Sequence, residues 1–308
     1  MSVLNEISRF TFGTMSLGGA DLASMANDVK VARSAMDAGV WFHTSREYAG
    51  GDTFAVLRRA FTEDRQHVPH CIFKCRRNNA DILEYDIESA LTRLNLERLS
   101  VVQLCGSMQS FYRNPSTLIH DCLHEGPMWN LIQRYRSSGQ VQAFALEIFS
   151  STSESVIPLI KRDLFDAYIF YYNVFEREVS DAALQTIQAT GKAILALRTL
   201  GAAPRGQLPE QLQRPEAFGA EFSLLIRDRM LRGIRDRAGF PTWLDLSLAF
   251  LFAHPQVVTS IGGTRQLDHL ERYLEAEKRC KPLATSLRDE IDELHRVWFG
   301  SPVQFTEQ

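Results

Sequence analysis

The sequence lacks the features that would place it in several specialised protein classes. No apolar run reaches the roughly 18 residues that suggest a membrane-spanning helix, so no membrane association is expected. The formal net charge is only −3, which gives no reason to expect nucleic acid or an anionic membrane as a partner. The first residues lack the basic start and apolar core of a signal peptide. We therefore expect a cytoplasmic protein.

Cysteine is scarce and irregularly spaced. The five cysteines are Cys71, Cys75, Cys105, Cys122 and Cys280. An odd number without regular spacing argues against a disulfide framework and for reduced thiols. Repeats, low-complexity tracts and flexible linkers are missing from the 308 residues as well, so a single domain is expected. No Gly-x-Gly-x-x-Gly motif opens a helix after the first strand pattern, which disfavours a doubly wound dinucleotide-binding fold.

What the sequence does have is an alternation of short apolar runs with helical patterns. Strand-like runs lie at residues 10–15, 40–43, 71–74, 100–105, 141–146, 165–170, 193–197 and 256–261. Helical patterns lie at residues 27–38, 53–64, 81–95, 127–137, 153–160, 181–190, 242–252 and 265–278. Short apolar strands between helices indicate a parallel sheet that is covered on its outer face. Eight such units predict one (β/α)8 TIM barrel over residues 1–308, with a loop–helix insertion at 201–240 and a C-terminal helix at 283–298.

Polar residues end several of the predicted strands. His43, Lys74 and Cys105 end three of them, Glu147 follows a fourth, and Tyr48 lies in the loop after the first of these. In a parallel barrel the carboxyl ends of the strands meet at one mouth, where active sites are built. These five side chains are therefore the candidate catalytic residues. A metal site is not expected, because Cys75 alternates with Lys74 across its strand and points away from His43 and Cys105.

Collinear motifs along nearly the whole chain resemble the aldo-keto reductase superfamily. They are Gly13-Thr14-Met15-Ser16-Leu17-Gly18, Ala38-Gly39-Val40 with Thr44 and Tyr48, Leu91-Thr92-Arg93-Leu94, Gly139-Gln140-Val141, Tyr172-Asn173 with Arg177, and Ile261-Gly262-Gly263-Thr264-Arg265. The resemblance implies a barrel, NADPH as cofactor, and a catalytic Asp, Tyr, Lys and His. Tyr48 and Lys74 match that set, but His43 stands in the Asp position and Cys105 in the His position.

The cofactor positions implied by the resemblance are altered too. Glu147 and Ile148 replace the Ser-Asn pair that holds the nicotinamide carboxamide, and Ile169 replaces a Gln, so two of the three cannot hydrogen-bond through their side chains. Leu197 replaces the aromatic residue that stacks on the nicotinamide.

At the adenosine end, Gly263-Thr264-Arg265 remains and Arg265 can face a 2′-phosphate, but His269 and Tyr273 replace the usual Gln and Asn. Arg198 is a further candidate for binding a phosphate or an anionic substrate. We expect NADPH binding to be weakened.

The chemistry of each candidate leaves alternatives open. Tyr48 needs an adjacent cation for proton transfer near neutral pH, and Lys74 fits that role; otherwise the two residues form an inherited packed contact without turnover. Without the family's carboxylate, Lys74 is expected to have a lowered pKa, so that neutral Lys74 or His43 acts as a base; otherwise His43 is a satisfied interior residue. Cys105 is either a nucleophile assisted by His43 or a buried core residue. Glu147 is either a second acid–base group, or it points to solvent or pairs with Arg198.

Three functional hypotheses follow for a small-molecule substrate that carries a carbonyl group. The first is acid–base chemistry of the isomerase, lyase or cyclase type, with hydride transfer lost or altered. The alternative is an NADPH-dependent reductase with a changed tetrad, and the third is a binding homologue without catalysis.

The surroundings of the mouth bear on the substrate. Arg46, Arg76, Arg77 and Arg198 form either a basic rim that suits an anionic substrate or ordinary solvated loop residues. Phe111 and Tyr112, in the irregular stretch at 106–127, and Trp129 form either an apolar substrate wall or ordinary packing. The sequence does not determine the oligomeric state.

Overall fold

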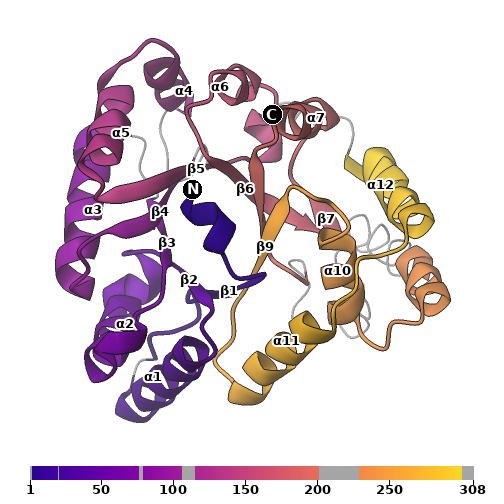
Figure 1. The fold of residues 1–308 in the computed structure, drawn as a ribbon, viewed down its shortest axis with the longest axis horizontal. Helices are drawn as coiled ribbons and strands as arrows, with labels where there is room; N and C mark the ends of the chain where they lie inside the picture. The colour runs from indigo at the N-terminus through magenta and orange to yellow at the C-terminus, as the bar shows by residue number, and fades with distance from the viewer. Residues whose placement is uncertain (1, 20, 76–78, 106–114, 201–228, 300–308) are drawn as a thin grey trace, which may run out of the picture.

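The fold is a closed barrel of parallel strands (Figure 1). This computed structural model describes residues 2–19, 21–75, 79–105, 115–200 and 229–299. The eight barrel strands are β1 (Phe10–Gly13), β2 (Trp41–Thr44), β3 (Cys71–Cys75), β4 (Leu99–Cys105), β5 (Val141–Glu147), β6 (Ala167–Asn173), β8 (Ala193–Leu197) and β9 (Val257–Gly262). They pair in the order β5-β4-β3-β2-β1-β9-β8-β6, and pairing of β5 with β6 closes the ring. The predicted (β/α)8 TIM barrel is confirmed.

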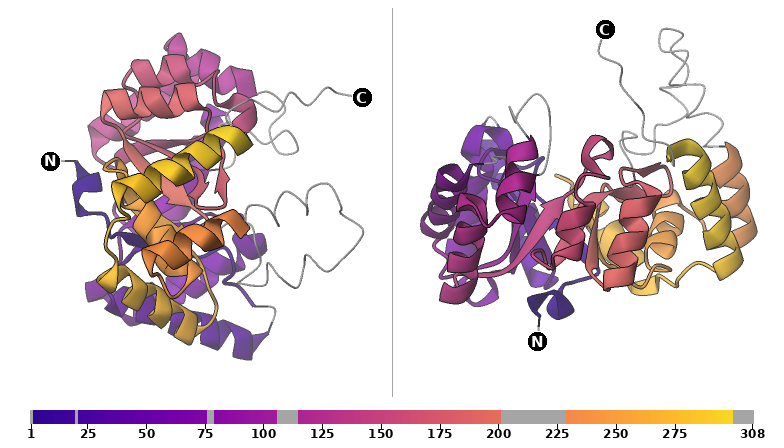
Figure 2. Two further views of the ribbon diagram at one scale, coloured as in Figure 1. Left: turned by 90° about the vertical axis from the view of Figure 1, so that its right-hand side faces the viewer. Right: turned by 90° about the horizontal axis from the view of Figure 1, so that it is seen from above.

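Helices surround the barrel on its outer side (Figures 1 and 2). The longer ones are α1 (Leu22–Asp37), α2 (Asp52–Glu63), α3 (Ala80–Leu94), α5 (Pro127–Ser138), α7 (Asp181–Thr190), α10 (Trp243–Leu251), α11 (Leu267–Arg279) and α12 (Thr285–Phe299). Their ends follow ordinary capping rules: the Ser180 side chain accepts a hydrogen bond from the backbone N–H of Ala183 at the start of α7, and Gly191 ends that helix at φ 66°. The C-terminal helix predicted at 283–298 is α12.

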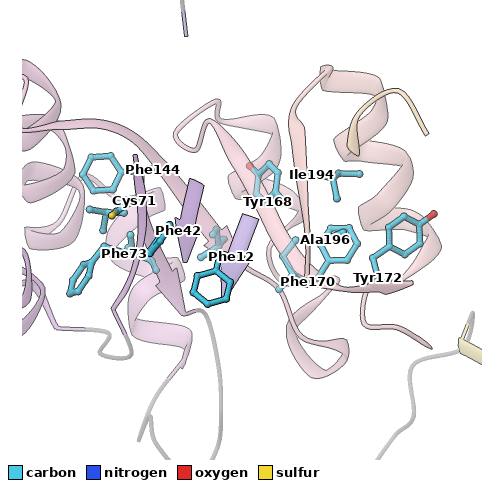
Figure 3. Packing of buried hydrophobic residues seen from close by; sticks show 14 of the residues in the cluster. Phe12, Phe42, Cys71, Phe73, Phe144, Tyr168, Phe170, Tyr172, Ile194 and Ala196 are labelled. Atoms are coloured by element: carbon cyan, nitrogen blue, oxygen red, sulfur yellow. The ribbon is translucent and has the colours of Figure 1, made fainter. Parts of the chain in front are cut away.

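Two layers of apolar side chains alternate along the strands. Phe42, Phe73, Phe144 and Phe170 belong to the outer layer, between sheet and helices (Figure 3). The alternate strand residues fill the inside of the barrel together with Val3 and Leu4 of the 3-10 helix η1 (Val3–Glu6). They include Trp41, Ile72, Val101, Ala143, Ala145 and Ile169. Because side chains alternate along a strand, residues two positions beyond these interior ones also point inward. His43, Lys74, Gln103 and Glu147 all meet that condition.

Several segments differ from the sequence-based expectation. After β6 the chain turns back into a two-residue antiparallel strand, β7 (Glu176–Arg177), which was not predicted. The Asn173 side-chain oxygen accepts hydrogen bonds from the backbone N–H groups of Phe175 and Glu176, and so holds this turn. Helix α4 (Pro115–Leu123) lies within the stretch 106–127 that was predicted to be irregular. In place of the helix predicted over 153–160, the chain forms turns followed by the short α6 (Ile157–Lys161).

Some expectations fall on residues that the structure does not describe. Arg76, Arg77, Phe111 and Tyr112 lie outside the described residues, as does most of the predicted insertion at 201–240. Its described end is helical over residues 229–238, so the helix ends four residues beyond the one predicted at 216–234. Within the described residues, no helix is long and apolar enough to cross a membrane.

Candidate functional site

Five buried polar side chains meet at the carboxyl ends of β2, β3, β4 and β5. They are His43, Lys74, Gln103, Cys105 and Glu147, and each is at most 9% exposed. The strand register brings them together, because Lys74 lies opposite Gln103 and Cys105 lies opposite Glu147 in neighbouring strands. We call this set the mouth cluster. Of the candidate catalytic residues, the structure therefore brings His43, Lys74, Cys105 and Glu147 into one hydrogen-bonded group.

Glu147 is the centre of the mouth cluster. The Lys74 Nζ atom lies 2.9 Å from Oε1 and 2.6 Å from Oε2 of its carboxylate. Oε2 also accepts hydrogen bonds from Gln103 Nε2 at 2.8 Å and from Cys105 Sγ at 2.9 Å. Glu147 is fully buried, so the expectation that it points to solvent or pairs with Arg198 is wrong. Its negative charge is matched by Lys74 and its oxygen atoms are well supplied with donors.

The ion pair reverses the expectation for Lys74. Burial is the largest single influence on Lys74 and lowers its pKa, but the charge of Glu147, followed by smaller contributions from Cys105 and Tyr48, outweighs it. The pKa of Lys74 is therefore raised, and the prediction of a lowered pKa was wrong because it took no account of an anion from β5. Burial acts to raise the pKa of Glu147, but attraction to Lys74 and the hydrogen bonds from Cys105, Lys74 and Gln103 lower it overall. Lys74 is thus held as a cation and Glu147 as an anion.

Tyr48 lies beside this cluster, in the 3-10 turn η2 (Tyr48–Gly51) that follows β2. It is 5% exposed, and its ring centroid is 6.3 Å from that of His43. The turn packs closely against the β1–α1 loop, where Gly18 has φ 106° and a Cβ atom would lie 2.6 Å from Ala49 Cβ. Only glycine fits there without strain, so Gly18 allows the Tyr48 turn to approach the barrel.

Within the mouth cluster, His43 contacts Gln103, a residue that was not among the candidates predicted from the sequence. Nε2 of His43 lies 2.7 Å from Oε1 of Gln103. Gln103 is fully buried inside β4. The signal that could have found it is its position two residues before Cys105, on the inward face of the same strand.

Cys105 is 1% exposed and donates its S–H to the Glu147 carboxylate. In this contact the S–H group is directed at a carboxylate that is already paired with Lys74, so Cys105 is one of the donors that hold Glu147. The arrangement favours the buried-core interpretation of Cys105. Cys75 points outward from β3, where its Sγ atom lies 3.2 Å from Oδ2 of Asp86.

Arg198 directly follows β8 and Glu178 directly follows β7, where the charges of Glu147 and Lys74 also act on Glu178. The Arg198 guanidinium lies 3.7 Å from the ring centroid of Tyr171 and forms a loose ion pair with Glu176 at 3.8 Å. Burial, followed by the nearby charge of Glu176, raises the pKa of Glu178 to about 7. The Oε2 atom of Glu178 is buried and has no hydrogen-bond partner among the described residues. A carboxyl of this kind beside a site is a functional candidate that the sequence pattern gave no reason to select.

The residues expected at the adenosine end are tied to one another. Arg265 donates to Asp28 through Nε at 2.9 Å and Nη2 at 3.1 Å. Asp28 is fully buried and also accepts hydrogen bonds from the backbone N–H groups of Gly18 and Gly19 at 2.9 and 3.0 Å. Gly263 packs so closely that a Cβ atom would lie 2.4 Å from the backbone oxygen of Gly13. The Arg265 guanidinium therefore already has an anion.

Thr264 and Tyr273, next to Arg265, are also engaged within the chain. Thr264 Oγ1 accepts a hydrogen bond from the backbone N–H of Gln266 at 3.1 Å. Tyr273 stacks on Phe10 with ring centroids 4.9 Å apart. Both contacts are made within the chain.

A closed parallel barrel with polar side chains gathered at the carboxyl ends of its strands is the arrangement in which TIM-barrel enzymes build their active sites. The chain belongs to the Aldo/keto reductase family, whose family model matches residues 9–296. The resemblance noted in the sequence is thereby confirmed at the level of the family. No curated protein sequence matches the chain.

Solved structures of low sequence identity share the fold. An aldo-keto reductase from Klebsiella pneumoniae in complex with NADPH is 17% identical, with a TM-score of 0.68 over 97% of this chain and 94% of that one. The glycerol dehydrogenase from Gluconobacter oxydans is 16% identical, with a TM-score of 0.70 over 98% and 95%. An aldo-keto reductase from Bacillus halodurans in its holo form is 17% identical, with a TM-score of 0.68 over 98% and 96%. At such identities the likeness shows the fold alone.

Proposed function

We propose that this chain is an enzyme that acts on the carbonyl group of a small molecule, with Tyr48 as the proton donor to the carbonyl oxygen. The observation that carries the proposal is the buried ion pair of Lys74 and Glu147, with which Tyr48 interacts electrostatically. A phenol transfers its proton more readily when a cation stands next to it. Glu147 keeps Lys74 charged. A carboxylate on β5 therefore takes the place of the family's Asp, whose position on β2 is occupied by His43.

The proton steps can be written from these residues. As negative charge develops on the carbonyl oxygen, the Tyr48 hydroxyl gives its proton to that oxygen, and Lys74 stabilises the phenolate that remains. Glu147, locked by three donors, acts on Lys74 and takes no proton itself. The hypothesis that neutral Lys74 is a general base has no support here, because the pKa of Lys74 is raised.

Reduction is the reaction that we favour, because the family and its structural neighbours support it better than isomerase-type chemistry. The neighbours include an aldo-keto reductase described in complex with NADPH and a glycerol dehydrogenase. NADPH binding by this chain is therefore part of the proposal. Arg198, whose side chain is 41% exposed, could bind an anionic group on the substrate. We propose a small carbonyl compound with such a group as substrate.

The described residues do not fit the family's way of holding a nicotinamide dinucleotide. Ile148 and Ile169 are fully buried apolar residues, and Glu147 has its oxygens engaged by Lys74, Gln103 and Cys105. Arg265 is engaged by Asp28. We therefore propose that NADPH binds weakly and assign no step of the mechanism to it. These same contacts favour a second candidate function, redox-neutral isomerisation or elimination at the same carbonyl, with Tyr48 again the proton donor.

The two candidate functions are separated by titrating the protein with NADPH and with NADH, with calorimetry and nicotinamide fluorescence as the readouts. Binding of either dinucleotide in the micromolar to high-micromolar range supports reduction. Absence of binding at millimolar concentration excludes reduction and leaves the redox-neutral reaction.

The role of Tyr48 is tested by comparing Tyr48→Phe with Tyr85→Phe. Tyr85 is 62% exposed on α3 and serves as the matched control. If both variants keep full activity on a substrate of the wild type, the proposed proton donor is wrong.

A further inference from the structure

Gln103 joins the two halves of the mouth cluster. It is fully buried in β4, between His43 of β2 and Glu147 of β5. Its side-chain Nε2 atom donates to Glu147 Oε2 at 2.8 Å, and its Oε1 atom lies 2.7 Å from Nε2 of His43. Both ends of the amide are therefore in short contacts. The contact with Glu147 determines the orientation of the amide, and that orientation determines which nitrogen of His43 carries the proton.

The orientation of the Gln103 amide follows from the chemistry of Glu147. An ionised carboxylate only accepts hydrogen bonds. If the amide were reversed, its oxygen would face the Glu147 carboxylate with no proton between them, in a buried site. Leaving buried acceptors unpaired in this way is costly. The amide NH2 group must therefore point to Glu147, and the amide oxygen must point to His43.

The amide oxygen in turn selects the tautomer of His43. Oε1 of Gln103 can only accept, so Nε2 of His43 has to carry a proton for a 2.7 Å contact. The other neutral tautomer, with the proton on Nδ1, would set two lone pairs against each other. A neutral imidazole has one donor nitrogen and one acceptor nitrogen, so Nδ1 becomes the acceptor.

We infer that Gln103 is a positioning residue that, anchored on Glu147, fixes the proton of His43 on Nε2 and makes Nδ1 the nitrogen through which His43 exchanges protons. The tautomer of His43 is a property of the free protein. Only its role in catalysis rests on the proposed function. In the proposed reaction Tyr48 is left as a phenolate, and His43 would take up a proton from solvent at Nδ1 and return it to that phenolate. The ring centroids of the two residues lie 6.3 Å apart. The polarised chain from Glu147 through Gln103 would stabilise the imidazolium that forms.

The tautomer can be measured directly by 15N NMR on protein with labelled histidine. The spectrum is recorded at about pH 8, where histidines of ordinary pKa are neutral. A His43→Asn variant identifies the signals of His43 among those of the eight histidines. In the wild type, Nε2 of His43 is expected to give a protonated, pyrrole-like signal and Nδ1 an unprotonated, pyridine-like one.

Two variants show whether Gln103 causes this. Gln103→Leu is expected to move both His43 signals towards the average of a tautomer mixture. Gln142→Leu, on the neighbouring strand but next to the inward-facing Ala143, is the matched control and should leave them in place. His70, whose Nδ1 atom lies 2.8 Å from Ser100 Oγ, is an internal reference that should move in neither variant.

A pyridine-like Nε2 in the wild type would overturn the inference, as would unchanged His43 signals in a folded Gln103→Leu protein. If Gln103→Leu does not fold, the wild-type spectrum alone still decides the tautomer. No substrate or cofactor is added to these samples. A failure of the proposed carbonyl chemistry, seen in the dinucleotide titration, is therefore distinct from a failure of the assigned tautomer.

Discussion

Removing the charge of Glu147 should destabilise the protein strongly, and the structure indicates by how much. Glu147→Gln keeps the size of the side chain but leaves Lys74, whose side chain is 10% exposed, as a buried cation without an anion. Breaking a buried ion pair on one side costs about 3–5 kcal/mol, most of it from the charge left behind. Because the amide oxygen of the substituted side chain could still accept one hydrogen bond, we expect the lower end, about 3 kcal/mol of unfolding free energy.

The assay is equilibrium unfolding in urea for wild type, Glu147→Gln, Lys74→Met and the double variant. The double variant should be more stable than Glu147→Gln, because it no longer buries an unpaired charge. Glu63→Gln, which removes a carboxylate from exposed pairs with Arg33 and Arg59, is the control and should leave the unfolding midpoint unchanged.

The pH dependence has a defined sign. The pKa of Glu147 is lowered in the folded protein, so its contribution is present above its ordinary pKa and is lost as pH falls through the folded value. The pKa of Lys74 is raised, so its contribution is complete below its ordinary pKa of 10.5 and is lost as pH rises through the folded value. Between these limits, at about pH 5–10, the pair's contribution should be constant. The reasoning is refuted if Glu147→Gln costs under about 1 kcal/mol, or if the effects of the two single variants simply add.

Three further predictions concern other contacts. Asp28→Asn should release Arg265 and tighten NADPH relative to NADH by about tenfold in calorimetry; equal changes for both dinucleotides would show that Arg265 does not face a 2′-phosphate. Gly18→Ala should lower the free energy of unfolding by about 2–3 kcal/mol and displace the Tyr48 turn, because the added Cβ would lie 2.6 Å from Ala49 Cβ. The control is Gly39→Ala, which has φ 68° but open space around it and should cost only about 1 kcal/mol. Because the pKa of Glu178 is raised to about 7, folding stability should fall by up to about 3 kcal/mol as pH rises from about 4.5 to 7. Glu178→Gln should remove this pH dependence in thermal unfolding. A pH dependence that persists in the variant excludes Glu178 as its source.

The barrel could be predicted from sequence because its signals are local and repeated. Each strand from β1 to β9, except β7, is an apolar run, and each neighbouring helix has its own periodicity and end signals. The hairpin strand β7 has two residues and leaves no periodic pattern. It depends on the side chain of Asn173, which binds the backbone of the turn.

The site was only partly predictable for a different reason. Strand ends identified His43, Lys74, Cys105 and Glu147, but which of them pair depends on distances across the barrel. Lys74 and Glu147 belong to strands separated by β4, and their contact arises from the inward direction of both side chains. The pKa of Lys74 was therefore predicted with the wrong sign, although its position was correct.

The central claim is that Tyr48 protonates the carbonyl oxygen of a substrate during reduction. The most direct measurement is oxidation of NADPH and NADH by wild type, Tyr48→Phe and Tyr85→Phe across aldehydes, ketones and 2-oxo acids. The account predicts turnover of at least one anionic carbonyl compound, a fall in kcat of about 100-fold or more in Tyr48→Phe, and no change in Tyr85→Phe. Turnover that survives in Tyr48→Phe at the wild-type rate would contradict it.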